Sequence, residues 1–139
     1  MGQQVKNIMT SAPLTIDVDA PITAAAELMR DADIGALVVT ATSGVRGVLT
    51  DRDVTVRVVA TGADPATTAV GDVVAPDLVA VSPHDDVDTA TELMRTNALR
   101  RLPVLDGDNL VGIVSLGDLA IDRDPTSPLA DISSEAPNN

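Results

Sequence analysis

The chain of 139 residues contains no cysteine and no Phe, Trp or Tyr. Without cysteine it can form no disulfide, no thiolate metal site and no cysteine nucleophile. Without aromatic rings its core must be aliphatic, and a flat ligand would have to lie between aliphatic side chains and backbone. Hydrophobic residues still reach 45%, which is typical of a globular fold.

Positive charge is scarce, because 9 Lys and Arg stand against 21 Asp and Glu, for a net charge of -12. A nucleic acid would be repelled and would find no ring for base stacking, so no nucleic-acid partner is expected. No apolar run approaches the roughly 18 residues of a membrane span. Residues 1–10 lack the apolar region of a secretory signal. These absences predict a cytoplasmic protein without membrane contact.

The groups used in most covalent catalysis are missing as well. One histidine, no cysteine and no nucleophile elbow leave acyl transfer without its parts, and no glycine-rich loop ends in Lys-Ser/Thr. His84 precedes Asp85 and Asp86. A lone histidine without a second ligand pattern favours a solvated helix cap over a metal site. We expect no enzymatic activity, no metal and no certain cofactor.

The chain does contain an internal repeat. A shift of 65 residues places Glu27–Arg30 on Glu92–Arg95 and Asp53 on Asp118 without a gap. Such self-similarity indicates a duplicated structural unit. We predict repeats at residues 5–62 and 70–123, a linker at 63–69, and a disordered tail at 124–139, where Pro, Ser, Asp and Asn are frequent and periodicity is absent.

Each repeat reads as βαββα. Apolar residues three and four apart predict an amphipathic helix, and short apolar runs on either side predict strands. The fold class is therefore α/β (α+β), with tandem βαββα repeats. The expected strands are 14–16, 36–40 and 47–49 in the first copy and 79–81, 102–105 and 112–114 in the second, with closing helices near 51–62 and 116–121.

One short pattern recurs where the last strand of each repeat meets the closing helix. It reads Gly47-Val48-Leu49-Thr50-Asp51-Arg52-Asp53 in the first copy and Gly112-Ile113-Val114-Ser115-Leu116-Gly117-Asp118 in the second. A hydroxyl residue followed three positions later by an acid is typical of a helix capping box, worth about 1 kcal/mol. The same hydroxyl and carboxylate could instead contact the phosphate and ribose of a nucleotide at a helix N-terminus. The two interpretations are compatible.

This pattern, together with Val5-Lys6-Asn7-Ile8-Met9-Thr10 and Arg100-Arg101-Leu102-Pro103-Val104, resembles a CBS domain pair, or Bateman module. The chain is similar to the small stand-alone CBS proteins of actinobacterial hypoxia and stress responses. The resemblance implies two small sheets packed about a pseudo-twofold axis with helices outside. It also implies clefts between the repeats that bind AMP, ADP, ATP or an S-adenosylmethionine-like molecule.

Eight ligand-binding residues follow from that resemblance. The motif hydroxyls would contact phosphate and the motif acids ribose. Two arginines would reach phosphate, and two first-strand residues would line the adenine pocket. The first copy carries Gly35-Ala36 where the second has the arginines, so we expect unequal clefts. The predicted residues are Thr50, Asp53, Ser115, Asp118, Arg100, Arg101, Ile16 and Val81.

The leading hypothesis is a regulatory, sensory module that binds an adenosine-containing ligand and acts as a homodimer. The alternative is a ligand-free, acidic homodimeric interaction protein of a stress response, which would dock on an unknown protein partner through Ile34 and Val54–Val58. A third hypothesis is a CBS pair that serves an enzyme or channel in trans. Ligand binding and co-purification distinguish the three.

Overall fold

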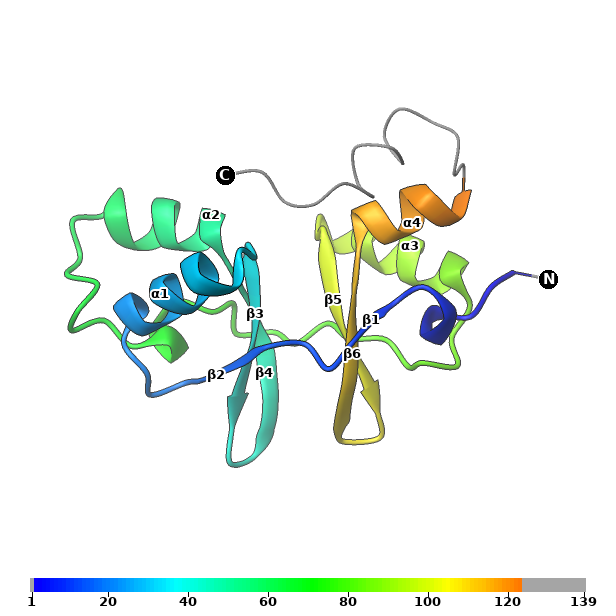
Figure 1. Cartoon of the computed structure of the whole chain (residues 1–139), viewed down its shortest axis with the longest axis horizontal. Helices are drawn as coiled ribbons and strands as arrows, with labels where there is room; N and C mark the ends of the chain where they lie inside the picture. The colour runs from blue at the N-terminus through cyan, green and yellow to red at the C-terminus, as the bar shows by residue number, and fades with distance from the viewer. Residues whose placement is uncertain (1, 124–139) are drawn as a thin grey trace. The chain divides into compact units, whose positions relative to one another are not determined.

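The computed structural model describes residues 2–123, and the predicted tail at 124–139 lies outside this range. The described chain forms two compact units, and Figure 1 colours the chain by residue number. We name Leu14–Leu78 the first unit, and residues 2–13 together with residues 79–123 the second unit. Each unit is a three-stranded sheet with helices packed against it.

The sheet of the first unit has the order β2-β3-β4. Strand β2 runs parallel to β3, and α1 supplies the crossover that parallel neighbours require. Strands β3 and β4 form an antiparallel hairpin, whose turn uses Gly44 at φ 122. The elements are β2 (Thr15–Asp17), α1 (Ile22–Ala32), β3 (Ala36–Ala41), β4 (Gly44–Thr50), α2 (Asp51–Val54), the π-helical turn η2 (Thr55–Val59) and the 3-10 turn η3 (Val70–Asp72).

The sheet of the second unit has the order β1-β6-β5. Its third strand differs from the expected one: residues 79–81 form only a single parallel bridge from Val81 to Val104, and β1 pairs with the far side of β6. Hairpin β5–β6 closes through Gly107, at φ 63. The elements are the 3-10 turn η1 (Val5–Asn7), β1 (Thr10–Ser11), α3 (Val87–Asn97), β5 (Arg101–Asp106), β6 (Asn109–Ser115) and α4 (Leu116–Arg123).

The compact units do not coincide with the sequence repeats, because the segment that opens each repeat packs on the other one. The amide of Val5 donates to the carbonyl of Asp85 at 2.9 Å, and the amide of Val70 donates to the carbonyl of Ala20 at 2.8 Å. Val70 is the repeat equivalent of Val5, and Ala20 is the repeat equivalent of Asp85, in each case by the shift of 65 residues. The exchange of opening segments is therefore reciprocal.

Side-chain burial follows the same exchange. Val5 is fully buried in the aliphatic core of the second unit, beside residues such as Val87 and Met94. Val70 is fully buried in the core of the first unit, beside residues such as Ile22 and Met29. The helices contribute the stripe that the periodicity predicts, since Ile22, Ala25 and Met29 on α1 are buried. Each core is therefore completed by the opening segment of the other repeat.

We expect Val70→Ala to lower the free energy of unfolding of the whole chain by about 2 kcal/mol, because it removes two buried methyl groups and leaves a cavity. Val5→Ala should cost a similar amount, since the two sites are equivalent. Urea unfolding measures both. Asp72→Ala, an exposed neighbour of Val70 in the same turn, is the control and should change stability by less than about 0.5 kcal/mol. A Val70→Ala effect no larger than the control would contradict the exchange.

Candidate functional site

Both copies of the recurrent motif form the capping box that the sequence predicts. The Asp53 amide donates to Thr50 Oγ1 at 3.1 Å, and the Thr50 amide donates to Asp53 Oδ2 at 2.9 Å. In the second copy the Asp118 amide donates to Ser115 Oγ at 3.1 Å, and the Ser115 amide donates to Asp118 Oδ2 at 2.8 Å. The motif therefore stabilises the strand–helix junction whether or not a ligand binds.

One carboxylate oxygen of each motif acid is left outside the cap. Asp53 Oδ1 lies 3.8 Å from Arg57 Nε, and the Asp53 side chain is 23% exposed. Arg57 is itself tied down, because its Nη1 donates to the carbonyl of Val73 at 3.0 Å. Within residues 2–123 no ion pair engages the other oxygen of Asp118. The remaining oxygens are the atoms that could accept hydrogen bonds from the hydroxyls of a ligand.

Sheet pairing gathers the predicted residues at one end of each sheet. We name the first edge the end where β2 and β3 begin and β4 ends, with Ala36 directly opposite Thr50. The second edge is the end where β5 begins and β6 ends, with Arg101 directly opposite Ser115. Opposite residues in an antiparallel pair project from the same face of the sheet. Arg101 and Ser115 are thus placed to act on one group.

The second edge holds the two arginines proposed for phosphate. Arg100 is exposed, and Arg101 is partly buried. The carbonyl of Arg100 accepts the Leu116 amide at 2.8 Å, which fixes the start of β5 against the start of α4. Among the described residues neither guanidinium takes part in an ion pair. Both positive charges therefore remain available to an anion.

Ile16 and Val81 do not join the other predicted residues. Ile16 is 9% exposed within the core of the first unit, and Val81 is 3% exposed within the core of the second. Their side chains therefore contribute to the cores, and their place in an adenine pocket stays a prediction. The alternation of side chains along a strand carried this information, because it places their neighbours Thr15 and Ala80 on the opposite face.

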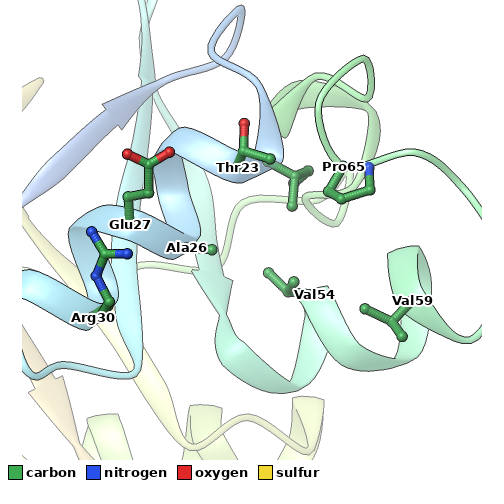
Figure 2. Close-up of a pocket in the computed structure, with 8 residues that line it drawn as sticks. Thr23, Ala26, Glu27, Arg30, Val54, Val59 and Pro65 are labelled. Atoms are coloured by element: carbon green, nitrogen blue, oxygen red, sulfur yellow. The ribbon is translucent and has the colours of Figure 1, made fainter.

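A separate apolar groove lies between α1 and the α2–η2 segment of the first unit, with a volume of about 410 Å³. Figure 2 shows Val54 of α2 and Val59 of η2 facing Ala26 of α1, with Pro65 at one end. Val59 is 65% exposed and nearby Val56 is 43% exposed. The eight lining residues are Ile22, Thr23, Ala26, Glu27, Arg30, Val54, Val59 and Pro65.

The exposed apolar surface of the first unit differs in part from the docking surface that the sequence predicts. Val58 is fully buried, while Ile34 and Val54 pack against the core. The exposed aliphatic residues of this segment are Val56, which lies within the expected range, and Val59, which lies one position beyond it. The π-helical geometry of η2 rotates side chains relative to an α-helix, so a period of 3.6 residues misassigns its faces.

His84 lies in an exposed turn, where its amide donates to Ser82 Oγ at 3.2 Å. In the part of the chain that the structure describes, no group of three or more His, Cys, Asp or Glu residues could hold a metal ion. Within the same range, no helix has the length and apolar character needed to cross a membrane.

Comparisons with known proteins agree with this architecture. The CBS domain family model matches residues 5–60 and again residues 70–121. The CBS domain-containing protein YhcV of Bacillus subtilis is 40% identical over 119 residues, which cover 86% of this chain and 84% of YhcV. Hypoxic response protein 1 of Mycobacterium tuberculosis is 33% identical over 116 residues, which cover 83% of this chain and 81% of the relative.

Solved structures give the same result. The crystal structure of Hypoxic Response Protein I with two coordinated zinc ions has a TM-score of 0.77 and 32% identity, over 85% of this chain and 97% of that one. The CBS domain pair of protein MJ0100, in complex with 5′-methylthioadenosine and S-adenosyl-L-methionine, has a TM-score of 0.81 over 91% of this chain and all of that one. Its identity is 19%, so it supports the fold alone.

The repeat, the two similar units and the matches over both halves of the chain have one explanation. This protein belongs to the CBS domain family, as a tandem pair of CBS domains of the kind that generally serves as a regulatory module.

Proposed function

We propose that this CBS pair is a cytoplasmic regulatory module, without enzymatic activity of its own, that binds an adenosine-containing ligand such as AMP, ADP, ATP or an S-adenosylmethionine-like molecule. The observation that carries the proposal is the second edge, where Arg101 and Ser115 lie directly opposite each other on β5 and β6. Arg100 immediately precedes β5, and Asp118 caps the start of α4. Two cations, a hydroxyl and a carboxylate are the groups that recognise a phosphate and a ribose.

Each group has a distinct part in this proposal. The arginines attract the phosphate, since guanidinium groups bind phosphate oxygens by charge-assisted hydrogen bonds. The oxygen of Asp118 that the cap leaves unused accepts from the ribose hydroxyls. Ligand binding regulates only if the ligand has different affinities for two arrangements of the protein or of its partner. A protein with the same fold forms a complex with 5′-methylthioadenosine and S-adenosyl-L-methionine, and this supports an adenosine compound as the ligand.

We expect Asp118→Ala to weaken binding of an adenosine ligand at least tenfold, because hydrogen bonds to a charged group contribute about 1.5–3 kcal/mol. A thermal-shift screen of the purified, ligand-stripped chain against AMP, ADP, ATP, NAD and S-adenosylmethionine identifies the ligand. Binding at 100 times the dissociation constant stabilises the native chain by about 2.7 kcal/mol. Titration calorimetry then compares the variant with the parent.

Asp85→Ala is the matched control for loss of a carboxylate that accepts from a main-chain amide three residues earlier. Asp85 Oδ2 accepts from the Ser82 amide three residues earlier at 2.9 Å, in the same geometry as the motif acid but outside the second edge. It should lose similar stability and keep full affinity. Equal ligand affinity in Asp118→Ala and Asp85→Ala would reduce the motif to a cap, and no shift with any adenosine compound would refute the proposal.

The groove of the first unit supports a second proposed property, which is assembly of a homodimer through α1 and η2. A second copy of the chain suits this surface because Glu27 and Arg30 lie on its rim, one helical turn apart. A twofold axis would place the acid of one copy against the base of the other. At the equivalent positions of α3, Asp88 and Thr91 replace Thr23 and Ala26, so the same apolar surface is not repeated.

We expect Val59→Asp, alone or with Val56→Asp, to raise the dimer dissociation constant at least tenfold, because a charge would be buried against an apolar surface. Sedimentation velocity over a micromolar concentration series measures this. Thr42→Asp, at the exposed β3–β4 turn, adds the same charge away from the groove and should leave assembly unchanged. A parent chain that stays monomeric throughout the series would rule out the homodimer.

A further inference from the structure

The two edges share one backbone arrangement but differ in the chemistry of two positions. The Asp51 amide donates to the carbonyl of Gly35 at 3.0 Å, and the equivalent Leu116 amide donates to the carbonyl of Arg100 at 2.8 Å. The two bonds join equivalent positions, because Leu116 and Arg100 lie 65 residues after Asp51 and Gly35. The first edge therefore pairs a glycine with an aspartate where the second edge pairs an arginine with a leucine.

The Asp51 carboxylate fills the space beside Gly35. A Cβ atom added at Gly35 would stand only 2.9 Å from Asp51 Oδ2 and 3.3 Å from its carboxyl carbon. The other carboxylate oxygen, Oδ1, accepts from the Arg52 amide at 2.9 Å, which holds the group in place. A side chain at position 35 would have to displace this carboxylate. The glycine thus makes room for a negative charge at the place where the second edge carries a positive one.

The charge balance of the two edges is consequently opposite. We count the charged residues of the recurrent motif and of the two positions at the start of the strand paired with it. The first edge has one positive residue, Arg52, and two negative ones, Asp51 and Asp53. The second edge has Arg100 and Arg101 against Asp118 alone. Like charges in one site disfavour binding and opposite charges favour it. An anionic group on a ligand is therefore repelled by the first edge and attracted by the second.

Neither Arg57 nor Arg52, which is already counted, makes the charge of the first edge positive. Arg57 is held by the Val73 carbonyl and lies beside Asp53. Arg52 is exposed, and it is next to Asp51, the residue that its own amide holds.

We infer that Gly35 and Asp51 together act as a specificity determinant that excludes phosphate from the first edge, so that the chain binds one phosphorylated adenosine compound, at the second edge. The first edge then takes an adenosine compound that carries no phosphate. This inference rests on the proposed function, because it assigns the ligand class of each edge. The determinant is the carboxylate of Asp51, and Gly35 is the residue that accommodates it.

Titration calorimetry of the full chain with AMP and with adenosine tests the inference. We expect one AMP and two adenosine molecules per chain. Arg100→Ala should weaken AMP binding at least tenfold and change adenosine affinity less than threefold, because it removes a phosphate contact only. The double variant Gly35→Arg with Asp51→Leu, which copies the second edge onto the first, should bind a second AMP.

Asp51→Asn provides a milder test, since an amide keeps an acceptor for the Arg52 amide and loses the charge. It should admit a second AMP more weakly than the double variant does. Two AMP molecules of similar affinity on the parent chain would overturn the inference, and so would a single AMP site in both Asp51 variants. Adenosine and AMP binding with equal affinity and stoichiometry would overturn it while leaving the proposed function intact. If neither AMP nor adenosine binds, this inference is overturned, and the proposed function is then decided by the thermal-shift screen with ADP, ATP and S-adenosylmethionine.

Discussion

The structure depends on the reciprocal exchange of the segments that open the two repeats. Val5 and Val70 are each completely buried in a core built mainly by the other repeat, and each such burial stabilises the fold by roughly 1.5–3 kcal/mol. The accompanying amide bonds anchor the segments to the loops that precede α1 and α3. Neither repeat can complete its core from its own residues, so the pair is the smallest stable module.

The exchange also explains why the strand–helix junctions are so regular. Once both cores are filled, each sheet has a fixed end at which Thr50 or Ser115 caps the closing helix. The cap uses the hydroxyl oxygen and one carboxylate oxygen as acceptors. It leaves the hydroxyl hydrogen and the other oxygen of Asp53 or Asp118 for a ligand. A carboxylate with one oxygen in the cap and the other accessible destabilises the ligand-free protein little, because no buried polar atom is left without a hydrogen bond.

Local patterns predicted much of this fold, and non-local packing accounts for what they missed. The repeat shift, the helices and the capping boxes follow from spacing within a few residues. The exchange could not be predicted because Val70 contacts residues some fifty positions away, such as Ala20. Ile16, predicted to line an adenine pocket, lies in the core of the first unit, where strand alternation directs it. The π-helical turn at Thr55–Val59 departs from the period of 3.6 residues that the sequence analysis assumed. The position of the Asp51 carboxylate beside Gly35 depends on three-dimensional packing.

The duplicated junction separates residues that maintain the fold from those that choose a ligand. The motif hydroxyl and acid are restricted in both copies, because each supplies half of a cap. The bonds from Asp51 to Gly35 and from Leu116 to Arg100 use main-chain atoms only, so these hydrogen bonds do not depend on the four side chains. Positions 35 and 51 must still fit each other, because the Asp51 carboxylate occupies the space beside Gly35. The shared motif therefore reports the fold, and the charge of a ligand must be sought at the flanking positions, where the two copies have opposite chemistry.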